Sequence, residues 1–127
     1  MRSETKLWLM LAEDDYKNAI LLWENRRYGA TVFFCQQAVE KLLKAYIVER
    51  KKKLPLKTHR IEILIKEAGL DIEEIKSPDV TELSKAYIRV RYPDLSRQYY
   101  RRRERVEPLV SIAKDVYLWI KRKFKKA

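Results

Sequence analysis

The sequence predicts an all-α protein, folded as an up-and-down bundle of four to five helices. The 127 residues include 2 glycines and 4 prolines, too few turn-forming residues for a β-sandwich or a β-barrel. Apolar residues recur at steps of three and four along most of the chain, which is the period of one helical face. A chain of this length is of ordinary size for one domain, so we expect residues 1–127 to form a single domain.

The first two predicted helices are long and antiparallel. The first spans about residues 3–25, with Ser3 as its N-cap, and its apolar face consists of Trp8, Leu11, Ala12, Tyr16, Ala19, Ile20 and Trp23. The second spans about residues 30–52. Gln37 and Lys41 fall on or beside its apolar stripe, which indicates either a functional role or a position at the stripe's edge with the lysine amine reaching water.

Capping signals divide the rest of the chain. Thr58 is expected to cap a helix that ends before Gly69, and residues 70–76 form a connector with at most one short turn. Ser77, followed by a proline, predicts the start of a helix over about residues 77–91, which Pro93 brings to an end. The last helix runs from about residue 101 or 106 to residue 123, with Pro108 either in its first turn or at a kink.

Charge is distributed unevenly along the chain. The net charge of +11 arises mainly from two basic segments, residues 49–60 at +5 and residues 85–127 at +10, which are separated by residues 61–84 at −5, while residues 1–48 carry +1. A polarised basic surface favours a polyanionic partner, and the alternative is a solvated surface with ion pairs. The abundance of Lys, Arg and Glu is also typical of thermophile proteins.

Several kinds of site and location are excluded or disfavoured. One histidine, His59, and one cysteine, Cys35, cannot build a zinc site or an internal disulfide, so we expect no metal and no cofactor. Cys35 lies in an apolar run and is expected to be buried. The sequence shows no signal peptide and no apolar run long enough to span a membrane, so we expect a cytoplasmic protein without a membrane partner.

Cationic residues are the candidates for ligand binding. At a predicted helix end, the Arg91 guanidinium can bind a phosphate through two hydrogen bonds, and the Tyr92 ring can stack on a base. The alternative is that Arg91 pairs with Asp94. Lys41 and Lys44 line one cleft, unless Lys44 instead pairs with a carboxylate one helical turn earlier. A further cluster mixes cations with neighbouring tyrosines, as sites for single-stranded nucleic acid do; its cations are Arg101, Arg102, Arg103 and Arg105.

Four features together resemble the HEPN domain family. They are Asp15 followed by the break at residues 28–30, the stretch Gln-Gln-Ala-Val-Glu-Lys-Leu-Leu-Lys-Ala at residues 36–45, Thr58-His59 after a basic loop, and Tyr87 followed by Arg-Tyr-Pro-Asp at residues 91–94. The resemblance covers nearly the whole chain. It implies a helical bundle, usually a homodimer, that binds a nucleotide or RNA and pairs with a minimal nucleotidyltransferase in a toxin–antitoxin-like system.

Many HEPN relatives are metal-independent ribonucleases with an arginine followed four to six residues later by a histidine, and this sequence lacks that motif. We therefore expect a non-catalytic binding module, with no catalytic residue assigned. The alternative is a ribonuclease that uses Arg91 with an unusual base, Asp94 or His59. A second alternative is a purely protein-binding structural module, with Tyr99, Tyr100 and Trp119 as its exposed interface.

Overall fold

The computed structural model describes residues 1–125 and is all-α in that part, as the sequence predicts. Lys126 and Ala127, which belong to the expected domain, lie outside the described residues. The elements in chain order are α1 (Ser3–Glu24), α2 (Tyr28–Tyr46), the π-helical turn η1 (Ile47–Lys51), α3 (Ile61–Glu67), the 3₁₀ turn η2 (Ile72–Ile75), α4 (Val80–Ser84), α5 (Ala86–Arg89), α6 (Pro93–Tyr100) and α7 (Arg103–Lys125).

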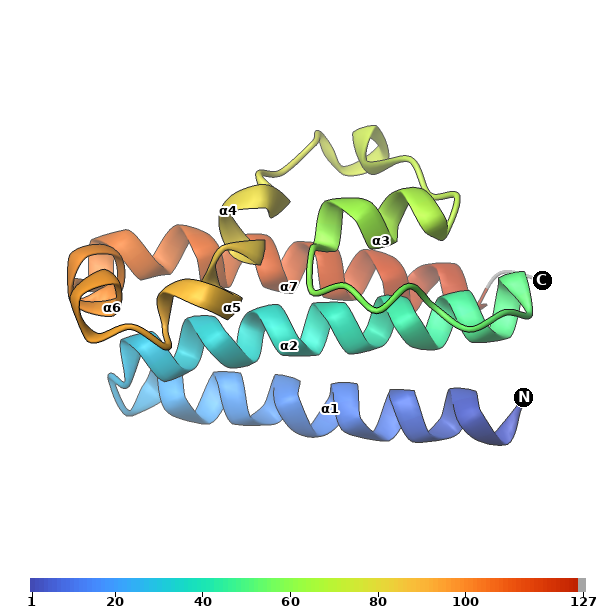
Figure 1. Ribbon diagram of the computed structural model, residues 1–127, viewed down its shortest axis with the longest axis horizontal. Helices are drawn as coiled ribbons and strands as arrows, with labels where there is room; N and C mark the ends of the chain where they lie inside the picture. The colour runs from blue at the N-terminus through green and yellow to red at the C-terminus, as the bar shows by residue number, and fades with distance from the viewer. Residues whose placement is uncertain (126–127) are drawn as a thin grey trace.

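Three long helices build the bundle, and the short ones connect them. Figure 1 shows α1 antiparallel to α2, while α7 runs in the same direction as α2. A parallel pair needs a long connection, and the segment from α3 to α6 provides it. Helix α2 occupies the middle, and its side chains Leu42 and Leu43 are fully buried in the same core as Ile61, Leu83 and Ile120.

Local rules predict two of the boundaries correctly. Helix α3 ends at Glu67 with Ala68 as its C-cap, and the next residue, Gly69, has a φ of +70° that suits a residue without a Cβ. The N–H groups of Gly69 and Leu70 donate to the carbonyls of Lys66 and Ile65, which is the Schellman pattern. Tyr92 is extended, as expected of a residue before proline.

Two predicted N-caps are wrong because contacts between distant segments replace them. Helix α1 is preceded by Arg2, not Ser3, and the Arg2 backbone N–H donates to the Glu49 carboxylate. Helix α3 starts at Ile61, three residues after Thr58, because the Ile61 N–H donates to the buried Ser84 hydroxyl at 2.8 Å.

The predicted helix over residues 77–91 is instead the pair α4 and α5, separated at Lys85. Ser77 has a φ of +46° and cannot cap, so Asp79 takes that place and accepts from the Glu82 N–H. The sequence prediction also missed α6, although Pro93 at its first position is a helix-start signal. Helix α7 begins at Arg103, so Pro108 lies inside the helix.

The three aromatic residues that were expected to form an exposed protein interface are buried or partly buried in the bundle. Tyr100 is 3 % exposed and Trp119 is 2 % exposed, while Tyr99 packs partly buried against the core. The Trp119 indole N–H donates to Glu74. No helix within residues 1–125 combines the length and the apolar character that crossing a membrane requires.

Candidate nucleic-acid interface

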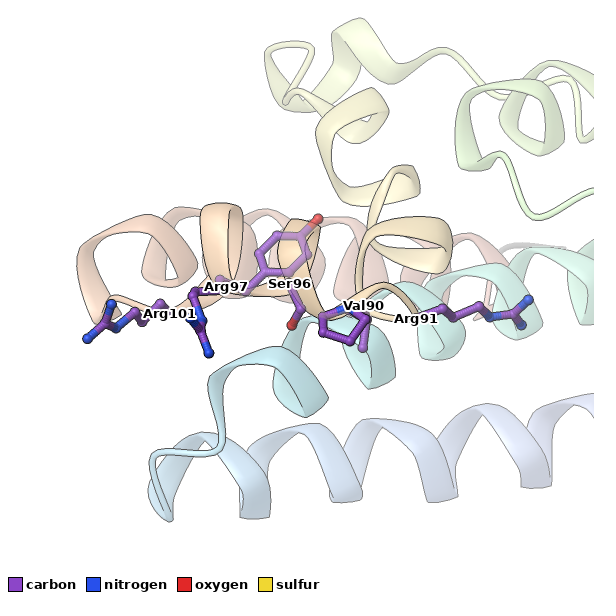
Figure 2. Close-up of a pocket in the computed structure, with 7 residues that line it drawn as sticks. Val90, Arg91, Ser96, Arg97 and Arg101 are labelled. Atoms are coloured by element: carbon purple, nitrogen blue, oxygen red, sulfur yellow. The ribbon is translucent and has the colours of Figure 1, made fainter.

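An open, basic cavity lies beside α6. Its volume is about 630 Å³, and its lining includes Arg91, Arg97 and Arg101 together with Ser96 and Tyr100. Figure 2 shows Arg97 and Arg101 projecting on one side, with Arg91 pointing the opposite way along the bundle. The guanidinium groups of Arg97 and Arg101 therefore lie on one side of the cavity lining, and that of Arg91 lies apart from them.

A second cavity of about 310 Å³ continues this surface onto the turn before α7. It is lined by Arg97, Gln98, Arg101, Arg102 and Arg105. We call the two cavities together the arginine groove, defined by Arg91, Arg97, Arg101, Arg102 and Arg105.

Local sequence explains how the groove is held. Arg97 and Arg101 are four residues apart, so they project from one side of α6 and its C-cap. Pro93 begins that helix, and Gly29 of α2 allows it to approach closely. A Cβ built on Gly29 would lie 3.1 Å from the Ser96 Oγ, which is closer than an ordinary contact.

The groove is electrostatically unsatisfied. Among residues 1–125, no carboxylate lies within ion-pair distance of Arg97, Arg101 or Arg102. Arg102 also directly precedes the N-terminus of α7, where the helix dipole disfavours positive charge. An anion bound in the groove would relieve both costs, and phosphate matches the donor geometry of guanidinium groups.

A buried polar cluster on α2 lies next to the groove. The Glu40 side chain is 5 % exposed and accepts from Lys44 Nζ at 2.9 Å and from Gln36 Nε2 at 3.0 Å. His59 Nδ1 lies 3.0 Å from the same carboxylate. A carboxylate can only accept, so Nδ1 carries the proton and the Nε2 of a neutral His59 is an acceptor. The His59 side chain is 45 % exposed.

Tyr87 joins the polar cluster to the arginine groove. The His59 ring stacks on Tyr87 with centroids 3.5 Å apart, and the Arg91 guanidinium lies 3.9 Å from the centroid of the same ring. Both groups cannot occupy one face of the ring at these distances, so they lie on opposite faces. Arg91 therefore makes a cation–π contact with Tyr87, and not the ion pair with Asp94 that was the alternative to a ligand-binding role.

Other predicted binding residues have partners inside the protein. Lys41 Nζ lies 2.6 Å from Asp15 of α1, and Lys44 pairs with Glu40, the alternative that its spacing allows. Arg103 pairs with Glu107 and lies over the Trp23 ring. These three cations stabilise the bundle and do not line the groove.

The remaining predicted residues lie on the surface. Tyr92 is 54 % exposed beside Arg91, and Asp94 is exposed in the first turn of α6. Sequence reasoning did not select Arg97 or Glu40 for the site. The signal for Arg97 was its spacing of four residues from Arg101.

The structure limits other chemistry. Burial raises the pKa of the Cys35 thiol to about 12, so it stays protonated and unreactive at neutral pH. Burial also raises the pKa of Tyr100, which the nearby Arg89 partly opposes. Residues 1–125 contain no group of three or more His, Cys, Asp or Glu side chains placed to hold a metal ion.

Fold and site together define the class: a small helical bundle with an open, unpaired arginine surface. The HEPN domain model matches residues 5–123, and the chain belongs to that family. A similar solved structure is that of TT1696 from Thermus thermophilus, with 25% sequence identity and a TM-score of 0.75, over 96% of this chain and 99% of that chain. No curated protein matches the chain.

Proposed function

We propose that this chain is a non-catalytic HEPN module that binds RNA or a nucleotide through the arginine groove, in a toxin–antitoxin-like pair with a separate nucleotidyltransferase. The observation that carries the proposal is the row of Arg97, Arg101 and Arg102 with no internal carboxylate partner among residues 1–125. HEPN domains are often connected with nucleotides or RNA. Tyr92, exposed beside Arg91, adds a ring on which a base can stack.

The test is binding of a labelled single-stranded RNA of mixed sequence, measured by fluorescence anisotropy at several salt concentrations. We expect affinity to fall as salt rises, because each phosphate contact releases counterions. ATP and AMP in the same assay distinguish a nucleotide ligand from RNA. Absence of binding to all three, or an affinity that does not change with salt, would reject the proposal.

The expected partner is tested separately. Co-expression with a minimal nucleotidyltransferase encoded beside this chain's gene should give a complex that co-purifies. Binding to RNA without such a complex would leave the groove's role intact and remove the toxin–antitoxin pairing.

A second candidate, a metal-independent ribonuclease, is favoured by the contact between Glu40 and His59. Glu40 fixes the tautomer so that Nε2 can take the proton from a ribose 2′-hydroxyl. The 2′-oxygen would attack the adjacent phosphorus, and the bond from phosphorus to the 5′-oxygen would break. The 5′-oxygen would take a proton from solvent and leave a 2′,3′-cyclic phosphate, while Arg91 would stabilise the added charge on the phosphate.

Incubating the protein with RNA in the presence of a chelator separates the two candidates. Binding without cleavage supports the module. Cleavage that yields a cyclic phosphate and is lost in both Arg91→Ala and His59→Gln supports the enzyme. Cleavage that survives both substitutions rejects this site as its source.

A further inference from the structure

A third cavity adjoins the arginine groove and shares two side chains with it. Its volume is about 310 Å³, and residues of α4, α5, α6 and the first half of α7 line it (Figure 1). Tyr100 also lines the groove's cavity beside α6, and Arg105 also lines the groove's cavity on the turn before α7. The apolar part of the lining comes from α7 and consists of Pro108, Leu109 and Ile112. We call this cavity the Tyr100 cavity.

The Tyr100 cavity differs from the groove because its lining contains carboxylates, those of Asp79 and Glu82. Glu82 pairs with Arg89 at 3.2 Å, whereas no cation among residues 1–125 lies within ion-pair distance of Asp79. Asp79 Oδ1 accepts from the Glu82 backbone N–H at 3.3 Å as the N-cap of α4. A carboxylate has room for further donors. The two acids therefore disfavour a phosphate here and suit a neutral ligand that carries N–H groups.

The Tyr100 hydroxyl is a buried donor without an acceptor. The residue is 3 % exposed, and its hydroxyl makes no hydrogen bond within residues 1–125. Arg89 and Glu82 both act on the pKa of this hydroxyl, so it lies on the side of the residue that faces the Tyr100 cavity. The Arg89 guanidinium carries only donors and cannot accept the phenolic proton. A buried polar group without a partner is costly, and a ligand atom that accepts this proton would relieve the cost.

Guanine presents the base edge that complements these groups. Its N1–H and N2–H donors lie side by side, so one carboxylate can accept from both, and the neighbouring O6 is an acceptor. Asp79 offers the carboxylate, and Tyr100 offers the donor. Adenine and cytosine present one amine beside an acceptor nitrogen, which a carboxylate repels, and uracil presents one N–H between two carbonyls. The apolar side chains of α7 would cover the rings of the base.

We infer that the Tyr100 cavity is a guanine pocket, in which Asp79 accepts from N1–H and N2–H of one unpaired guanine and Tyr100 donates to its O6. The volume of about 310 Å³ is at the lower end of the range for small-molecule sites, which suits a single base. Because the hydroxyl is covered in the free protein, the base reaches it only when a lining side chain moves. The inference rests on the proposed function, since the adjoining arginine groove would hold the phosphates of the same strand. Arg105 lines both, so a phosphate in the groove and a base in the pocket can belong to one nucleotide.

The first test compares labelled oligouridine strands that carry one central guanine, adenine, cytosine or hypoxanthine, by fluorescence anisotropy at one salt concentration. We expect the guanine strand to bind at least about tenfold more tightly than the adenine and cytosine strands, because a good bidentate contact discriminates by this amount or more. Hypoxanthine lacks the N2 amine but keeps N1–H and O6, so its strand should bind with intermediate affinity.

The second test asks whether the named groups make the distinction. Asp79→Asn should abolish the preference for guanine over adenine, while an Asn at this position still caps α4. Tyr100→Phe should reduce the preference without lowering the unfolding temperature, because the hydroxyl that it removes has no partner in the free protein. The matched control is Asp71→Asn, which also removes the charge of an N-cap carboxylate but lies outside the cavity, and it should keep the preference.

The outcomes separate this inference from the proposed function. Equal, salt-dependent affinity for all four strands would overturn the guanine pocket and leave the role of the arginine groove intact. Failure to bind any strand would reject the proposed function, and the pocket with it. A preference for guanine that survives Asp79→Asn, or that Asp71→Asn removes equally, would also overturn the pocket.

Discussion

Removing Arg97 and Arg101 together should abolish most of the salt dependence of RNA binding while preserving the fold. Within residues 1–125, these two residues and Arg102 are the groove arginines that contact neither a carboxylate nor an aromatic ring, whereas Arg91 and Arg105 lie over the rings of Tyr87 and Tyr99. Each phosphate contact on a single strand contributes about −0.7 to the slope of log affinity against log salt, so three contacts give about −2.1. Affinity should then fall about twentyfold between about 50 and 200 mM salt.

For the variant Arg97→Gln/Arg101→Gln, one contact is left and the same change in salt should lower affinity only about threefold. Fluorescence anisotropy with labelled single-stranded RNA measures both slopes. The control is Lys121→Gln/Arg122→Gln, which removes two exposed cations from the far end of α7 and changes the net charge by the same amount. A control as strongly affected as the groove variant would show that net charge alone governs binding, and would refute the assignment of a site.

Three further predictions concern stability. Glu40→Leu should lower the free energy of unfolding by roughly 3–5 kcal/mol in urea denaturation, because it leaves the Lys44 ammonium buried without its partner, and adding Lys44→Met should recover part of the loss. The free energy of unfolding should change by about 0.5 kcal/mol more favourably for Gly29→Ala in a Ser96→Ala background than in the wild type, because the Ser96 hydroxyl that the new Cβ would crowd is then absent. Additive effects of the two substitutions in a double-mutant cycle would count against that contact. Burial raises the pKa of the Cys35 thiol to about 12, whereas the pKa of a thiol in the unfolded chain is about 8.5. The buried, protonated thiol therefore contributes fully to stability below about pH 8.5, and this contribution is lost as pH rises toward about 12. The free energy of unfolding should fall by up to about 1.4 kcal/mol per pH unit in that range. Cys35→Ala should show a shallower alkaline decline in thermal denaturation, and an unchanged decline would refute this.

Sequence reasoning succeeded where the determining interaction is local. The end of α3 before Gly69 depends on residues within one turn, and the extended conformation of Tyr92 depends on the next residue. The start of α3 depends instead on Ser84, 23 residues away, and could not be read from Thr58. Helix α6 is different, because Pro93 gave a local signal that the prediction interpreted only as a stop.

The same distinction applies to the site. Arg101 and Arg102 were predicted from composition and lie in the groove. The pairing of Lys41 with Asp15 spans 26 residues and two helices, so no local pattern shows that its charge is already used. The position of Arg91 against Tyr87 and His59 also requires the fold, because His59 precedes α3 while Tyr87 lies in α5.

The distribution of ion pairs explains why the groove is the part of this surface best suited to bind an external anion. Acids on α1 and α2 neutralise lysines within the bundle, as Asp15 does for Lys41 and Glu40 does for Lys44. The segment from Arg97 to Arg102 carries only cations among its charged residues, and its last residue, Arg102, directly precedes a helix N-terminus that disfavours positive charge. The fold keeps these like charges adjacent because packing of Tyr100 and the contact at Gly29 fix α6 in place. A phosphate chain would lower the free energy of this arrangement, so binding should raise the unfolding temperature of the wild type more than that of Arg97→Gln/Arg101→Gln.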